Sequence, residues 1–258
     1  MFTPLANRIK GDSVNFMATC LCDAIFDDAA ISAAKILRKF AKKVEFPQEQ
    51  TCCGQPAFNS GDFESARKVI RHTMKAFSHN DWPIIVPSAS CAAMLFHSSK
   101  IAFRESPQSE QEAVEKFSLR VWEFCDYLVN ALGVEEIGGK YKAKAAVHNS
   151  CHGRGTRTPE SLKKLLTSIE GLEIVEFESQ DECCGFGGTF SVVFPQISSE
   201  MGEAKVRAVA AAKPDIVVAA DTSCLLHQRG IAQKLGINYP AKHAAQVFYE
   251  AMKNGGIA

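Results

Sequence analysis

The chain has 258 residues with 29 basic and 29 acidic side chains, and without a basic excess we expect no nucleic-acid partner. Its longest apolar stretches fall far short of the roughly 20 residues of a membrane-spanning helix, and its N-terminal residues resemble no signal peptide. We therefore expect a cytoplasmic protein, in which thiols stay reduced, so the ten cysteines favour metal or redox chemistry over disulfides.

Short β-rich apolar runs alternate with helical patterns along the chain, which is typical of an α/β fold with buried parallel strands. Strands are expected at Val14–Met17, Val44–Phe46, Ile84–Val86, Ala145–His148, Glu173–Phe177 and Ile216–Ala220. Helices with apolar residues three and four positions apart are expected around Ile31–Ala41, Phe63–Phe77, Leu162–Ile169 and Ile197–Ala208. Asp27 and Asp28 are candidate caps of the first helix, and Gly133–Lys144 is the expected linker between two halves.

Eight of the cysteines form two sets with matching spacing. The sets are Cys20, Cys52, Cys53 and Cys91, and then Cys151, Cys183, Cys184 and Cys224. The first three members of each set are 131 residues apart from their counterparts, and the fourth members are 133 apart. Such regularity indicates an internal duplication. We predict two similar halves, residues 1–137 and 138–258, related by an approximate two-fold axis, each with a short parallel sheet flanked by helices.

Each repeated cysteine is expected in a loop after the carboxyl end of a strand, where open α/β sheets bind ligands. Four thiolates from three loops suit a soft metal, either zinc or the iron of an iron–sulfur cluster. Adjacent cysteines reach one site only if the backbone turns, and Gly54 and Gly185 supply that turn. Gly187 and Gly188 continue the second loop, and we expect these glycines to bring N–H groups close to the sulfurs. The eight repeated cysteines are therefore the predicted metal ligands.

Two further cysteines have no counterpart in the other half. Cys125 lies in a helical pattern that includes Trp122, and a lone buried cysteine usually behaves as a small hydrophobic residue. The same interpretation is favoured for Cys22, which is alternatively close enough in sequence to the first set to be a spare ligand.

Histidines and arginines near the second set are weaker candidates. His227 follows the last cysteine at a spacing used by metal ligands and is the candidate additional ligand. His148 and His152 are expected to be structural or solvated. Arg154 and Arg157 are able to hold a carboxylate, although a solvated loop explains them as well.

The Cys-Cys-Gly repeats resemble the cysteine-rich domain shared by the heterodisulfide reductases, the glycolate oxidase iron–sulfur subunit and lactate utilization protein A. Segments 52–61 and 183–191 are most similar to the lactate utilization protein A family, and the similarity covers nearly the whole chain. The resemblance implies an iron–sulfur subunit that oxidises L-lactate to pyruvate with a ferredoxin-like iron–sulfur subunit and a third subunit. Where the reductase repeats end in a fifth cysteine, this chain has Met94 and His227. The resemblance is therefore compatible with one iron–sulfur cluster, with two clusters, or with zinc in one half.

Three functions fit these residues. They are an iron–sulfur electron-transfer subunit, a zinc-stabilised scaffold that docks partners, and a thiol–disulfide redox protein similar to heterodisulfide reductase. No Gly-x-Gly-x-x-Gly motif opens a helix after the first strand, so we expect no hydride transfer by the chain alone and assign no catalytic residue.

Overall fold

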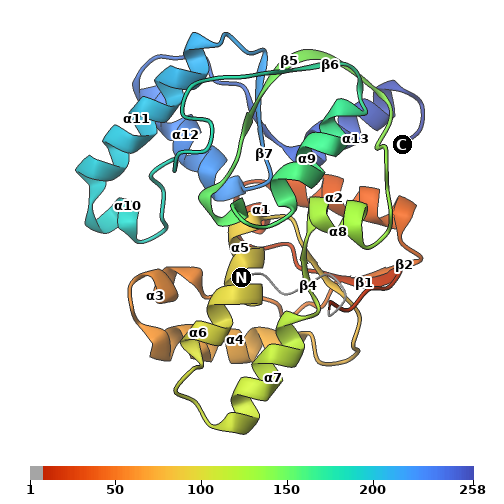
Figure 1. Cartoon of the computed structure of the whole chain (residues 1–258), viewed down its shortest axis with the longest axis vertical. Helices are drawn as coiled ribbons and strands as arrows, with labels where there is room; N and C mark the ends of the chain where they lie inside the picture. The colour runs from red at the N-terminus through yellow and green to blue at the C-terminus, as the bar shows by residue number, and fades with distance from the viewer. Residues whose placement is uncertain (1–7) are drawn as a thin grey trace.

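The computed structural model describes residues 8–258 and shows two halves stacked on one another, the N-terminal half below in Figure 1. Each half contains a four-stranded parallel sheet with helices on both faces. The strand orders are β2-β1-β3-β4 and β6-β5-β7-β8, so the second sheet repeats the first. The predicted α/β fold with two similar halves is confirmed, while residues 1–7 of the expected first repeat lie outside the described range.

The strands of the first sheet are β1 Ser13–Phe16, β2 Lys43–Glu45, β3 Ile84–Val86 and β4 Val121–Glu123. Those of the second are β5 Lys140–His148, β6 Glu170–Val175, β7 Ile216–Ala219 and β8 Ala241–His243. All six predicted strands occur, but β4 and β8 were missed because each has three residues and continues without a break into a helix, α8 or α13. Trp122 therefore lies in β4 and not in the expected helix.

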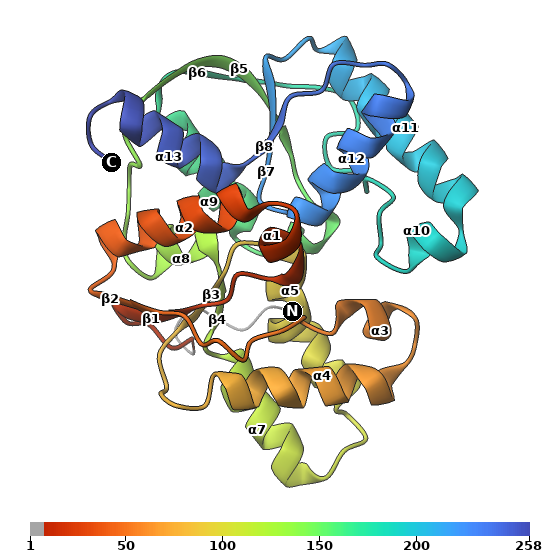
Figure 2. The ribbon, with the colours of Figure 1, turned by 180° about the vertical axis from the view of Figure 1, so that it is seen from behind.

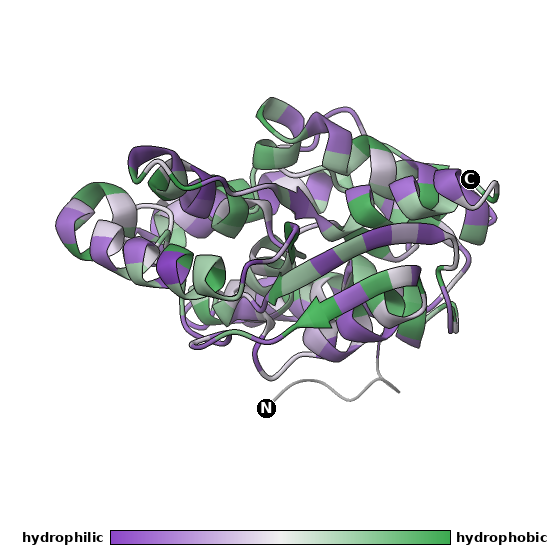
Figure 3. Cartoon of the chain, turned by 90° about the horizontal axis from the view of Figure 1, so that it is seen from above, coloured by the Kyte–Doolittle hydropathy of each residue, from purple (hydrophilic) through white to green (hydrophobic). Residues whose placement is uncertain are grey.

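The helices of the first half are α1 Cys20–Ala24, α2 Asp27–Phe40, α3 Gln55–Asn59, α4 Phe63–Ala76, α5 Ala89–Ala93, the π-helix η2 Met94–Ser98, α6 Ser99–Ala102, α7 Gln108–Ser118 and α8 Phe124–Asn130. Those of the second are the 3₁₀-helix η3 Cys151–Gly153, α9 Thr158–Thr167, α10 Phe190–Val193, α11 Pro195–Ala211, α12 Thr222–Lys234 and α13 Ala244–Asn254. Many of them carry hydrophilic and hydrophobic residues side by side, as expected for helices that cover a sheet (Figure 3).

Two local expectations are corrected. Asp27 and Asp28 are not caps, because α2 has Phe26 at its N-cap position and both acids lie in the first turn. There their negative charges still interact favourably with the helix dipole. The expected linker is shorter than Gly133–Lys144, because β5 begins at Lys140 and pairs there with β6. The boundary that we propose between residues 137 and 138 falls between α8 and β5.

The main core lies between the two sheets and is shared by both halves. Helix α2 packs against α13, and α8 packs against α9, as Figure 2 shows from behind. Because α2 and α9 follow equivalent strands, as α8 and α13 do, these reciprocal contacts are what a two-fold relation produces. The rings of Phe124 and Phe248 stack across this layer with centroids 6.5 Å apart. The shared core leads us to expect that the halves unfold together.

Candidate metal centres

The first set of cysteines meets at the carboxyl edge of the first sheet. Cys20 opens α1, Cys91 lies in α5, and Cys52 and Cys53 lie in the loop before α3. The Cys52 side chain interacts directly with Cys20 and with Cys53, and Cys53 interacts with Cys91. Cys20 and Cys91 lie in short helices and not in the expected loops, because only residues 17–19 separate β1 from α1 and residues 87–88 separate β3 from α5.

The second set has the same arrangement. Cys151 opens η3 and Cys224 lies in the first turn of α12, so neither lies in the expected loop, whereas Cys183 and Cys184 share a loop. Cys183 interacts with Cys151 and with Cys184, and Cys184 interacts with Cys224. Each half therefore brings its own four thiols together, in the same order of contacts.

A glycine in the left-handed region lets each pair of adjacent cysteines face one site. Gly54 and Gly185 both have φ of 89°, a conformation that side chains other than glycine rarely adopt. Their N–H groups donate to the Sγ atoms of Cys52 and Cys183, at 3.4 Å in both halves. Gly187 and Gly188 border a cavity of about 30 Å³ beside the second set.

Hydrogen bonds among the sulfurs shift the thiol pKa values in opposite directions. Hydrogen bonds from Cys20 and then Cys53 lower the pKa of Cys52, and the Gly54 N–H lowers it further. The same bond raises the pKa of its partner Cys20. The second set repeats this pattern, with the pKa of Cys183 lowered, first by Cys151. A metal that binds either set must displace the protons that these thiols share.

His148 is the functional candidate that the sequence reasoning missed. One of its ring nitrogens lies within 4.8 Å of the sulfurs of Cys184 and Cys224. The ring is buried, and neither nitrogen has a hydrogen-bond partner among the described residues. Burial, and next Lys205, lower its pKa to about 4, so the imidazole is neutral and able to bind a metal. His148 is therefore not solvated. Its position as the last residue of a buried strand, directly before the cysteine loop, was the available signal.

His227 has a different environment. Its Nε2 atom lies 3.2 Å from the carbonyl oxygen of Ser198 on α11, and it is not part of the group formed by His148 and the two thiols. The close packing of α11 and α12 requires Gly202 at this point, because a Cβ there would lie 2.8 Å from the His227 ring.

The two sites differ in the side chains around the thiols. Three methionines of the first half stand where the second half has ionisable residues, namely Met17 for His148, Met74 for Lys205 and Met94 for His227. The methionines belong to or pack against the apolar cluster that contains Cys53. Lys205 is 1% exposed and donates to the carbonyl oxygens of Ser179 and Gln180. The first site is therefore apolar, whereas the second holds a buried cation.

Contacts between the halves bring the two sites next to each other. Asp221 caps α12 through the N–H of Ser223 and also accepts the N–H of Ser90 in α5, at 3.0 and 2.6 Å. Gln55, directly after the first Cys-Cys-Gly, contacts His152 at 3.1 Å. Residues next to the thiols of one half thus form hydrogen bonds with residues next to the thiols of the other half.

The remaining candidates lie apart from the contacting thiols. The Cys22 sulfur is 3.9 Å from the Pro87 carbonyl oxygen and from the Thr222 hydroxyl, and burial raises its pKa to about 11. Cys125 is fully buried in α8 within the shared core. Arg154 is exposed, whereas Arg157 lines a separate cavity described below.

This fold and these sites define a duplicated, cysteine-rich α/β protein with two four-thiol sites. Among the described residues, no helix has both the length and the apolar character needed to cross a bilayer. The family model described as "Cysteine-rich domain" matches residues 14–96 and 145–229. The chain belongs to the lactate utilization protein A family of cysteine-rich proteins.

Known relatives support this assignment. The chain is 37% identical to lactate utilization protein A 1 of Bacillus mycoides (strain KBAB4), covering 95% of this chain and 99% of that protein. It is 39% identical to lactate utilization protein A of Shouchella clausii (strain KSM-K16), with coverage of 91% and 98%. A crystal structure of a hypothetical protein from Helicobacter pylori shares the fold, with a TM-score of 0.67 at 12% identity. The alignment covers 99% of this chain and 53% of that chain.

Proposed function

We propose that this chain is an iron–sulfur electron-transfer subunit of a multi-subunit complex that oxidises L-lactate to pyruvate. The observation that carries the proposal is a pair of four-thiol sites on a chain that closely resembles proteins named for lactate utilization. Thiolates are the ligands of iron–sulfur clusters, so the donor set fits one cluster in each half. When bound, such a cluster supplies one-electron transfer. The proposed ligands are Cys20, Cys52, Cys53, Cys91, Cys151, Cys183, Cys184 and Cys224.

The surrounding residues would tune the two sites differently. Hydrogen bonds to sulfur, nearby charge and burial set the reduction potential of a bound cluster. The Gly54 and Gly185 N–H groups act alike in both halves, whereas the buried cation Lys205 has the uncharged Met74 as its counterpart in the first half. A positive charge favours the reduced state, so the second site should have the more positive potential.

This difference has a direct test. In Lys205→Met, the potential of the second site should become more negative, whereas Met74→Leu, the matched control in the first half, should change neither potential much. A redox titration followed by electron paramagnetic resonance measures both. An unchanged second-site potential in a fully loaded Lys205→Met variant would contradict the proposed role of the charge.

Partner subunits are part of the proposal. We expect a ferredoxin-like iron–sulfur subunit and a third lactate-utilization subunit, in the cytoplasm. The purified chain should not oxidise lactate alone, and activity should appear when the three subunits are mixed. Lactate turnover by the lone chain with an artificial acceptor would contradict this. Because the net charge is zero, docking should depend weakly on salt.

Zinc in the second half is the alternative that a specific observation favours. His148 beside two thiols is a donor set that zinc also accepts. Iron, sulfide and zinc analysis of anaerobically purified protein separates the two functions, with visible absorption as a second measurement. Less than about one iron per chain, with stoichiometric zinc, would favour a scaffold. Rapid alkylation of the cysteines in the loaded protein would instead favour a thiol–disulfide enzyme.

A further inference from the structure

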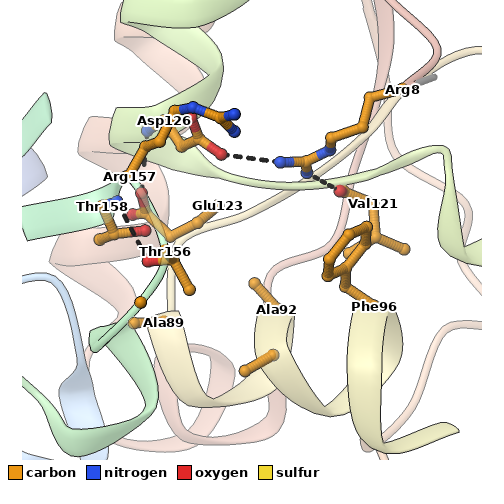
Figure 4. Close-up of a pocket in the computed structure, with 12 residues that line it drawn as sticks. Arg8, Ala89, Ala92, Phe96, Val121, Glu123, Asp126, Thr156, Arg157 and Thr158 are labelled. Atoms are coloured by element: carbon orange, nitrogen blue, oxygen red, sulfur yellow. Dashed lines mark hydrogen bonds and ion pairs between the residues drawn. The ribbon is translucent and has the colours of Figure 1, made fainter. Parts of the chain in front are cut away.

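A cavity of about 170 Å³ lies between the two halves, apart from the thiols (Figure 4). Its walls come from Arg8, from α5 and η2, from β4 and the start of α8, and from the segment 155–158 that leads into α9. No cysteine is among the described residues that line it. The cavity is therefore a feature separate from the two metal sites.

One wall holds a buried ion pair. Arg8 donates to Asp126 at 2.8 Å, and their side chains are 7% and 5% exposed. A second nitrogen of Arg8 donates to the Val121 carbonyl oxygen, and the guanidinium stacks 3.7 Å from the centroid of Trp122. These contacts fix Arg8, and Asp126 neutralises its charge.

The opposite wall supplies a second guanidinium. Arg157 lines the cavity and has no hydrogen bond or ion pair from its side chain within residues 8–258. Figure 4 draws Arg157 in the part of the cavity wall near Asp126 and Glu123, and the ion pair of Asp126 is with Arg8. Burial lowers the pKa of Arg8 most, and Arg157 lowers it further, which reflects repulsion between the two cations. The cavity wall thus holds two guanidinium groups, of which only Arg8 is paired with a carboxylate.

Glu123 supplies a hydrogen-bond donor and not a second negative charge. Its Oε2 accepts the N–H of Asp126 at 2.9 Å, while its buried Oε1 has no hydrogen-bond partner in the described part of the chain. Burial raises the pKa of Glu123 to about 8, although the backbone N–H groups of Asp126 and Cys125, and next the Thr158 hydroxyl, oppose the shift. At pH 7 this carboxyl group is mostly protonated. The cavity then carries one positive charge in excess.

We propose that this cavity binds a small monocarboxylate between Arg157 and Glu123. A monoanion matches the single surplus charge, whereas a phosphate dianion or a dicarboxylate would leave an uncompensated negative charge in a buried site. The short chain of such a ligand would lie against Ala89, Ala92 and Phe96. Lactate and pyruvate belong to this class. Their assignment as the natural ligands rests on the proposed function, but the binding of the class does not.

The test is a titration of the anaerobically purified full chain at pH 7 with propionate, lactate and pyruvate, with phosphate, succinate and propionamide as comparisons. Tryptophan fluorescence reports binding because Trp122 stacks on Arg8, and calorimetry confirms it. We expect the three monocarboxylates to bind and the comparison compounds to bind at least tenfold more weakly. Arg157→Gln should weaken monocarboxylate binding at least tenfold, whereas Arg154→Gln, an exposed arginine in the same loop, should match the wild type.

A pH series tests the role of Glu123. Ionisable groups around it are Arg8, Arg157, and Cys125 and Asp126 of α8. Wild-type affinity should fall as the pH rises through 8, because Glu123 then becomes an anion. Glu123→Gln keeps a donor without the charge and should bind at pH 7 and at pH 9 alike.

Two results would overturn the proposal. One is the absence of any binding of the three monocarboxylates at concentrations up to tens of millimolar. The other is equal binding by Arg157→Gln and Arg154→Gln. Neither result depends on metal content or lactate turnover. A failed cavity is therefore distinguishable from a failed electron-transfer function.

Discussion

Replacing Gly185 by alanine perturbs the second site without removing a thiol. The loss of unfolding free energy follows from the backbone conformation of Gly185 and from the atoms packed around it. The residue has φ of 89°, and an L-residue in the left-handed region costs roughly 1–2 kcal/mol. An added Cβ would also lie 2.6 Å from the Ser198 carbonyl oxygen and 2.9 Å from the Met201 Cβ. Overpacking of this kind adds about 1–3 kcal/mol. The expected loss of unfolding free energy is therefore about 2–5 kcal/mol.

The duplication supplies a matched control. Gly54 has the same φ of 89°, but the nearest atom to an added Cβ is 3.4 Å away, so Gly54→Ala should lose only about 1–2 kcal/mol. Urea denaturation of the reduced protein, followed by circular dichroism and tryptophan fluorescence, measures both variants. Equal losses of unfolding free energy in Gly185→Ala and Gly54→Ala would show that the close packing of the second Cys-Cys-Gly loop on α11 does not add to the effect of the substitution. A loss below about 1 kcal/mol in Gly185→Ala would refute the strain argument as well.

Three further changes test the sites and the core. Cys184→Ser should remove the metal of the second site, because serine is a poor ligand for soft metals, whereas Cys125→Ser should leave both sites loaded. Iron, sulfide and zinc contents of the two variants measure this. Full metal loading of Cys184→Ser would contradict the ligand assignment. If zinc occupies the second site, His148→Gln should weaken its binding more than His227→Gln, since only the first ring is grouped with two thiols. A zinc titration that finds the reverse order would favour His227 as the ligand. The protein should lose stability as the pH falls from 6.5 toward 4, because burial lowers the pKa of His243 to about 4 and the unfolded chain therefore binds the proton first. Urea titrations between pH 7 and pH 4 measure this loss. An unfolding free energy that does not change over this range would exclude the predicted contribution of His243.

The sequence by itself determined the duplication and the identity of the thiol sites. Cysteine spacing is a linear property, so equal offsets between the two sets are visible without coordinates. The strands that carry the sites were also predictable, because β3 and β7 are uninterrupted apolar runs. The strands β4 and β8 were not, since a three-residue strand such as Ala241–His243 has no periodicity of its own and forms only by pairing with β7.

Only the tertiary structure decided which neighbours complete the sites. His148 and Cys224 are far apart in the chain, and their approach depends on the pairing of β5 with β7, whereas the spacing that favoured His227 describes only neighbours along one helix. The cavity between Arg8 and Arg157 likewise exists because two halves pack through a shared helical layer. A sequence pattern reports local periodicity and repetition, but the charge and proton affinity of a buried group depend on which distant segments surround it.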